Sequence, residues 1–242
     1  MTEPVSSLKA VQYLAKPETL WTREDLSKHP PPEQPGLYGW YFIEIPGPLG
    51  KRKFRCRGKG RVRVGRWLFR KWTLLYIGRA ETSLRERIVD EHFDGVPVRG
   101  QAMSTLRLSL GCLLARTDPR LGLVRYGSDP YSWGRDGEQV LSDWMAKNCR
   151  VAWYKASAYD PAECQAIVEA ERQAIEEYDV ALNITYNQEH PFCETLKGLR
   201  ETHKNLASLQ AEAVLAQARW QQCVNDMAAT ELRIEELWQS IR

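Results

Sequence analysis

Residues 35–42 read PGLYGWYF, an apolar run of β-favouring residues that contains the string Gly36-Leu37-Tyr38. A shorter counterpart, TLLYIG at residues 73–78, again joins a tyrosine to a glycine. Taken alone, each string is compatible with an ordinary core strand that carries a tyrosine at its edge. The segments that follow them along the chain give the pair a more specific meaning.

A helix is predicted directly after the second string. Residues 83–93 read SLRERIVDEHF, and either Thr82 or Ser83 can cap the helix N-terminus. Leu84 and Ile88 then lie on one face of the helix. A strand that ends in glycine and is followed by such a run indicates the order strand, turn, helix.

A further helix is predicted at residues 162–175, where AECQAIVEAERQAI has apolar residues at helical spacing. It leads to the step Leu182-Asn183. Glu169 and Glu171 both belong to this helix but stand two residues apart, so they lie on different faces. The two carboxylates therefore cannot serve the same site equally well.

These elements, taken in order, resemble the GIY-YIG nuclease domain, which is named for the two tyrosine–glycine strings. The resemblance covers about residues 35 to 200 and does not reach the C-terminal segment. It implies an α+β fold in which a small antiparallel three-stranded sheet is flanked by helices. It also implies an enzyme that hydrolyses phosphodiester bonds with a single divalent metal ion.

The resemblance implies catalytic roles for residues on both strings and on the first helix. Tyr38 is the implied base, and Tyr76 would orient or relay. The family carries an arginine on the first helix and, four residues later, a histidine or tyrosine. Arg87 fits the arginine, but Glu91 stands four residues later and His92 five. The sequence leaves open which of the two takes that position.

Glu171 is the implied metal ligand, for Mg²⁺ or Mn²⁺, and Glu169 is the less suitable carboxylate. A hard divalent cation on one carboxylate stabilises phosphoryl and leaving-group oxygens, and the guanidinium of Arg87 matches phosphate geometry. Asn183 closes the motif, either holding the fold or supporting the metal. A free phenol with a pKa of about 10 is a poor base at neutral pH, so Tyr38 needs help from a metal-bound water or a nearby cation.

The two strings are separated by a basic insertion at residues 46–72. Residues 51–71 contain eleven Lys or Arg and no Asp or Glu, alternating with apolar residues as in a β-ribbon with one cationic face. This pattern is typical of a nucleic-acid contact, and the alternative is a solvated loop without function. The predicted contacts are Arg55, Arg57, Lys59, Arg61, Arg63, Arg66 and, outside the insertion, Arg107.

The chain of 242 residues is long enough for one well-filled domain and an extension. We expect a helical segment with a Pro-rich lead at 1–34, a nuclease domain at 35–198 and a helix at 199–242. The net charge of +3 does not by itself indicate nucleic acid. Six cysteines without a CxxC pair argue against zinc, and without a signal peptide we expect free thiols in the cytoplasm. No apolar run approaches transmembrane length, so no membrane partner is expected.

Residues 199–242 carry apolar or small residues at alternating steps of three and four, with no Pro or Gly, over six heptads. This pattern predicts one long helix that forms a coiled coil, either with a second copy or with another protein. Small alanines and the bulky Trp220 in the seam do not suit a uniform parallel dimer. The alternative is an amphipathic helix folded back on its own domain.

Our first hypothesis is a metal-dependent DNA endonuclease, in which paired sites would suit double-strand cleavage in restriction or phage defence. A structure- or single-strand-specific repair nuclease is the second. A catalytically weak nucleic-acid-binding adaptor is the third. The intact Tyr38, Tyr76, Arg87 and Glu171 favour an enzyme, whereas the displaced His92 favours the adaptor.

Overall fold

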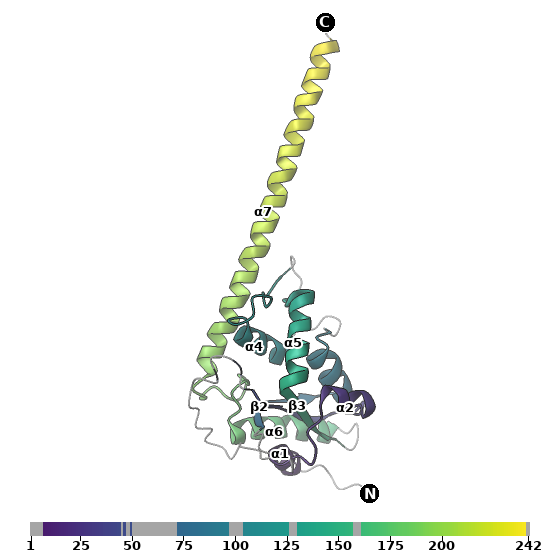
Figure 1. Cartoon of the computed structure of the whole chain (residues 1–242), viewed down its shortest axis with the longest axis vertical. Coiled ribbons are helices and arrows are strands. Elements are labelled where there is room, and N and C mark those ends of the chain that lie inside the picture. Colours follow the sequence, from purple (N-terminus) through teal and green to yellow (C-terminus); the bar gives the residue numbers. More distant parts are fainter. Residues whose placement is uncertain are drawn as a thin grey trace.

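The computed structural model describes residues 7–44, 46, 49, 72–96, 104–125, 130–156 and 161–240. Its centre is an antiparallel sheet of three strands in the order β2-β1-β3, and Figure 1 labels β2 and β3 in it. The strands are β1, Gly36–Phe42, β2, Thr73–Ala80, and β3, Cys149–Lys155. The predicted α+β fold with a three-stranded antiparallel sheet is confirmed.

The middle strand, β1, is buried along its whole length. Its side chains alternate between two apolar clusters, with Tyr38, Trp40 and Phe42 in one and Leu37 and Tyr41 in the other. A strand covered on both faces has no polar positions, which explains the continuous apolar run in the sequence. The sheet is therefore the middle layer between two layers of helices.

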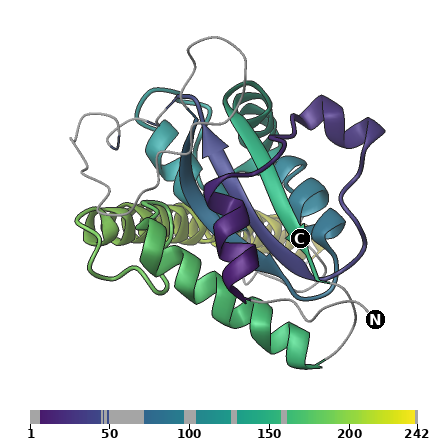
Figure 2. The ribbon, with the colours of Figure 1, turned by 90° about the horizontal axis from the view of Figure 1, so that it is seen from below.

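Two helices cover the face of the sheet that carries Tyr41 (Figure 2). They are α1, Ser7–Ala15, and α6, Pro161–Tyr178. The Tyr41 hydroxyl donates to the carbonyl of Leu14 at 2.6 Å, and the Tyr178 hydroxyl donates to the carbonyl of Val11 at 2.8 Å. The N-terminal helix is therefore tied to the sheet and to α6 through its own backbone, and it helps to complete the core.

A short helix, α2, spans Arg23–Lys28 within the N-terminal segment. The Thr22 side chain accepts from the backbone N–H of Asp25, and the Asp25 carboxylate accepts from the backbone N–H of Thr22, each at 2.9 Å. This reciprocal pair satisfies N–H groups that the first turn of a helix leaves without partners.

The opposite face of the sheet is covered by three helices. They are η1, Glu86–Phe93, α4, Thr105–Leu114, and α5, Gly134–Asn148. Nearly every residue of α4 is buried, because it lies between the sheet, α5 and the base of the C-terminal helix. Arg107 is among the buried residues of α4.

The expectation that Arg107 contacts nucleic acid is wrong. Its side chain is 1 % exposed and forms an ion pair with Glu138 on α5 at 2.5 Å. The guanidinium also donates to the carbonyls of His92 at 2.8 Å and Phe93 at 3.1 Å, at the end of η1. Arg107 thus joins three helices inside the domain, and it has no surface on which to meet a phosphate.

The C-terminal helix, α7, spans Cys193–Ser240 and begins before the predicted position of Leu199. Its base packs on α4, where Leu196 and Ala207 are buried. Beyond this base the helix leaves the domain as a rod (Figure 1), and residues 212–236 are exposed. The predicted long helix is confirmed, and it does not fold back on its own domain over these residues.

Two further expectations concern the cysteines and membrane-spanning segments. Cys112, Cys149, Cys193 and Cys223 are free thiols, as expected. Within the part of the chain that the structure describes, no helix combines the length and the apolar character needed to cross a bilayer.

We predict that Arg107→Ala destabilises the fold without acting on any DNA contact. Removing one partner of a buried ion pair leaves an uncompensated carboxylate and costs about 3 kcal/mol, the lower end of the usual range because Glu138 keeps some solvent contact. Urea unfolding measures the free energy of unfolding. Arg120→Ala, which breaks an exposed pair with Asp118, is the matched control and should leave the free energy of unfolding essentially unchanged. Equal stabilities for the two variants would contradict the structural role.

Candidate active site

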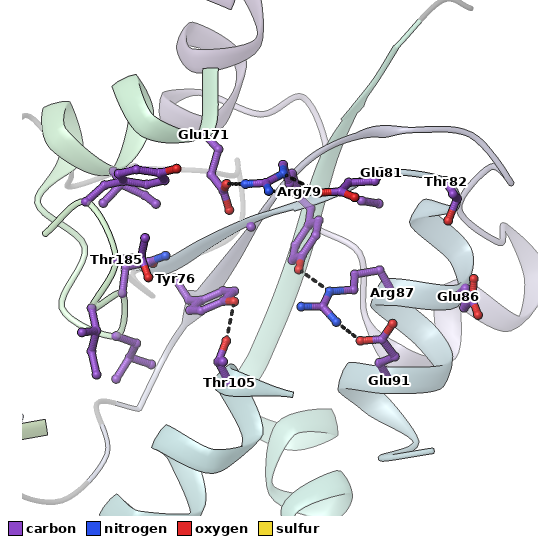
Figure 3. Close-up of a pocket in the computed structure, with 18 of the residues that line it drawn as sticks. Tyr76, Arg79, Glu81, Thr82, Glu86, Arg87, Glu91, Thr105, Glu171 and Thr185 are labelled. Atoms are coloured by element: carbon purple, nitrogen blue, oxygen red, sulfur yellow. Dashed lines mark hydrogen bonds and ion pairs between the residues drawn. The ribbon is translucent and has the colours of Figure 1, made fainter. Parts of the chain in front are cut away.

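A cavity of about 740 Å³ opens where β1, β2, η1, α4, α6 and α7 meet. Figure 3 labels side chains of β2, η1, α4 and α6 that line it. The tyrosines of both sequence strings line it, together with Arg87 and Glu171. The structure therefore brings together residues that the sequence spreads over more than a hundred positions.

The Tyr38 hydroxyl is the point on which the cavity's polar groups converge. It is hydrogen-bonded to Nε2 of His92 at 2.7 Å, and Nε of Arg87 donates to it at 3.3 Å. The side chains of Tyr38 and His92 are fully buried, so neither group can exchange this partner for bulk water. Strand β1 supplies the tyrosine, and η1 supplies both of its partners.

The wide turns of η1 resolve the choice between Glu91 and His92. Backbone bonds in this helix reach five residues, as in the 2.9 Å bond from the N–H of Asp94 to the carbonyl of Val89. A π-helical turn places residues five apart on one face, so His92 follows Arg87 toward Tyr38. Glu91 forms an ion pair with Arg87 instead (Figure 3). The extra residue before the histidine is absorbed by the helix and does not misplace the imidazole.

A second hydrogen bond fixes the far side of the His92 ring. Its Nδ1 lies 2.6 Å from the hydroxyl of Ser104, which also accepts from the backbone N–H of Arg107 at the start of α4. Burial, with the charges of Arg87 and Arg107, lowers the pKa of His92 well below its ordinary value. The imidazole is therefore neutral at physiological pH, and one of its nitrogens is an acceptor.

Burial raises the pKa of the Tyr38 phenol, and the nearby Tyr76 adds to this effect while Arg87 opposes it. The resting phenol is therefore protonated, and it has a neutral imidazole at hydrogen-bond distance. Both shifts hold the proton on the phenol in the resting site. Transfer to Nε2 therefore requires added negative charge nearby, such as that of a bound phosphate, with Arg87 beside the phenol oxygen.

Tyr76 is held by residues that the sequence pattern did not single out. Its hydroxyl lies 3.0 Å from the hydroxyl of Thr105 (Figure 3). Arg200, from the base of α7, donates to the carbonyl of Thr105 at 3.1 Å and to the hydroxyl of Ser109. The base of the long helix is thus part of the cavity wall. An arginine eight residues into a helix carries no distinctive sequence signal.

Glu171 lies on α6 with its carboxylate in the cavity wall, 13 % exposed. Arg79, at the end of β2, forms an ion pair with it and also with the exposed Glu81. Burial raises the pKa of Glu171, and Arg79 works against this rise. Glu169 forms an ion pair with Arg172 and is 40 % exposed, and of these two carboxylates only that of Glu171 lines the cavity.

The donor set fits a metal ion held by one protein carboxylate and otherwise by water. No cluster of three or more His, Cys, Asp or Glu that could hold a metal occurs among the described residues. Glu171 offers a hard oxygen donor of the kind that Mg²⁺ and Mn²⁺ bind. Because Arg79 engages Oε2 of this carboxylate, a metal ion must displace that guanidinium or share the carboxylate with it.

Asn183 acts on the backbone of β2. Its Oδ1 accepts from the N–H of Ile77 at 2.9 Å, and its Nδ2 donates to the carbonyl of Ile77 at 2.8 Å. Strand β2 is an edge strand, and these bonds satisfy groups that no neighbouring strand reaches. The side chain therefore fixes the segment after α6 to the strand that carries Tyr76, which supports a positioning role.

The glycines of the two strings are required by close packing. A Cβ atom at Gly78 would lie 2.4 Å from the Tyr38 hydroxyl, and one at Gly36 would lie 2.5 Å from the carbonyl of Tyr154. Both distances are far below van der Waals contact. The glycine of the second string thus makes room for the tyrosine of the first.

The predicted nucleic-acid contacts of the basic insertion, Arg55, Arg57, Lys59, Arg61, Arg63 and Arg66, lie outside the described residues. Strand β1 ends at Phe42, before the insertion, and β2 begins at Thr73, directly after it, and these two residues are paired. The strand ends that flank the insertion are therefore neighbours.

Comparison with protein families identifies the chain. The GIY-YIG catalytic domain matches residues 36–202, more than half of the chain, and the chain therefore belongs to this nuclease family. The match implies nuclease or phosphodiesterase activity on a nucleic acid, and nucleases of this family generally use a divalent metal. Comparisons with curated proteins and with solved structures found no match.

We predict that Gly78→Ala lowers the cleavage rate by about 10²-fold or more, because a displacement of roughly 1 Å at a catalytic group can cost this much. The added methyl group must push the Tyr38 hydroxyl away from His92. Single-turnover plasmid cleavage measures the rate, and circular dichroism checks the fold. Gly122→Ala is the control, since a Cβ atom there meets nothing within 4 Å. A wild-type rate for the Gly78 variant would contradict the assignment of Tyr38.

Proposed function

We propose that the chain is a metal-dependent DNA endonuclease whose active site is the cavity between Tyr38, Arg87 and Glu171. The observation that supports this proposal is the convergence of Arg87 and His92 on one buried hydroxyl, in a cavity that Glu171 also lines. A proton-transfer pair, a fixed cation and a hard oxygen donor are the three requirements of phosphodiester hydrolysis.

In the proposed reaction Tyr38 relays a proton. As the attacking water approaches phosphorus, it gives a proton to the Tyr38 oxygen while the Tyr38 hydroxyl gives its own proton to Nε2 of His92. No free phenolate accumulates, but the proton ends on His92, so the bound phosphate must raise the low pKa of this imidazole. The imidazolium that forms lies near Arg87, and the bound phosphate offsets this repulsion.

Arg87 stabilises negative charge on the phosphoryl oxygens, since its guanidinium stays protonated and can bind two oxygens at once. Glu91 forms an ion pair with the guanidinium and so limits its rotation. Glu171 would hold the divalent metal ion, which supplies Lewis-acid stabilisation of the phosphate and the leaving oxygen.

Substrate affinity is proposed to come from outside the cavity. Its wall carries Arg79, Arg87 and Arg200, but it also carries four glutamates, Glu81, Glu86, Glu91 and Glu171. Such a wall has no excess of positive charge to attract a polyanion. The basic insertion, which lies between the paired ends of β1 and β2, is the proposed source of phosphate contacts.

The alternatives from the sequence remain distinguishable. An adaptor without activity would need no proton-transfer pair, yet Tyr38 and His92 are hydrogen-bonded and buried together. A repair nuclease would use the same site on a different substrate. Two active sites held together would suit double-strand cleavage in restriction or phage defence, our proposed biological role, and the exposed part of α7 offers an assembly surface for this.

We predict that Glu171→Gln abolishes cleavage but leaves DNA binding intact, because it removes the proposed metal ligand and not the basic surface. The expected loss is about 10²-fold or more, the scale of one lost transition-state stabiliser. Plasmid, single-stranded DNA and RNA are assayed with Mg²⁺, with Mn²⁺ and with chelator, and binding is measured by fluorescence anisotropy. Glu169→Gln on the same helix is the matched control and should keep the wild-type rate. Full activity of the Glu171 variant would disprove the proposed site.

A further inference from the structure

The exposed part of α7 carries an alternating stripe of charge. Glu212, Arg219, Asp226 and Arg233 stand at intervals of seven residues and therefore lie along one side of the helix, with signs that alternate. All four are exposed, as is the neighbouring apolar seam. A stripe of this kind is complementary to itself when it is reversed.

The seam beside this stripe is apolar, and none of the residues that the structure describes covers it. Leu209, Trp220, Met227 and Ile234 are at least half exposed, with Trp220 at 70 %. Together with the small residues between them they form one continuous strip on residues 209–234. A contiguous apolar strip of this length on a projecting helix is a liability unless another surface covers it.

We propose that α7 pairs antiparallel with α7 of a second copy of this chain, with the pairing centred between Gln221 and Gln222. This inference concerns assembly and does not depend on the proposed nuclease activity. It commits to one occupant for the strip, a reversed second copy, because two independent features of the helix favour it.

The first feature is charge. In the antiparallel register, residues of the stripe face one another across the seam, so Glu212 meets the partner's Arg233 and Arg219 meets the partner's Asp226. Each contact occurs twice by symmetry, which gives four attractive pairs. In a parallel, in-register pair Asp226 would instead meet the partner's Glu231, which repels it.

The second feature is side-chain volume. A parallel pair would set Trp220 against the partner's Trp220 and leave the alanine layers without filling. In the antiparallel register the indole of Trp220 packs beside a small side chain, and the small side chain of Ala216 packs beside a long one. The layers are Trp220 with the partner's Cys223, Ala216 with the partner's Met227, Ala213 with the partner's Thr230, and Leu209 with the partner's Ile234.

The register also places the two domains at opposite ends of the paired helices. The pairing uses the rod from about residue 207 to residue 236, and each domain packs on the other side of the helix base through Leu196, Arg200 and Ala207. Arg200 lines the cavity, so the two cavities lie about 65 Å apart along the rod at 1.5 Å per residue. A parallel pair would instead hold them side by side.

Charge variants of the full-length chain test the orientation, with dimer dissociation measured by sedimentation at low salt. Asp226→Lys should weaken the dimer by roughly 10-fold, because the new cation would face the partner's Arg219 at two symmetric places. In a parallel dimer the same change would strengthen association through Glu231. Glu235→Lys, off the seam on the same exposed helix, is the control and should leave dissociation unchanged.

A charge swap provides the second test. Glu212→Arg and Arg233→Glu should each weaken the dimer to a similar extent, and the double variant should return dissociation to within about threefold of wild type. Circular dichroism verifies that every variant keeps the helix. A wild-type chain that is monomeric at micromolar concentration, a stronger Asp226→Lys dimer, or a double variant that fails to recover would each overturn the proposal.

Discussion

The buried hydrogen bond between Tyr38 and His92 constrains the rest of the site. A hydroxyl and an imidazole that are fully buried must be bonded to each other or to another polar group, because an unmet polar group costs about 1–3 kcal/mol. Three neighbouring features serve this bond. The π-helical turns of η1 bring His92 to the strand, and the Ser104 hydroxyl is bonded to the other ring nitrogen. Gly78, paired with Tyr38, has no side chain that would displace the phenol.

The sequence was sufficient to predict the elements whose signal is local. Both tyrosine strings form strands, and Glu171 lines the cavity with Arg87. The positions of Arg87 and Glu171 could be predicted because the helical periodicity and the spacing of the family motif agree there. It was not sufficient to decide between Glu91 and His92. A π-helical register arises from the packing of η1 on the sheet and leaves no pattern in the residues themselves.

The roles of the arginines could not be predicted either, because sequence alone does not distinguish a buried guanidinium from a surface one. Arg107 was expected on the surface and proved to be an internal tie between helices. Arg79 and Arg200 were missed, although both line the cavity. Their positions depend on the docking of α6 and of the base of α7, which are contacts between segments far apart in the chain. Tertiary packing, rather than residue type, assigns the role of each arginine.

The central claim is that the Tyr38 hydroxyl relays the proton in cleavage, and Tyr38→Phe tests it most directly because it removes one oxygen and keeps the ring. Single-turnover cleavage of plasmid DNA with Mg²⁺ should be compared with wild type at a temperature where both chains are folded. The account predicts a rate lower by roughly 10²-fold or more, the scale of a lost acid–base group, with DNA binding retained. A rate within a few-fold of wild type would contradict it.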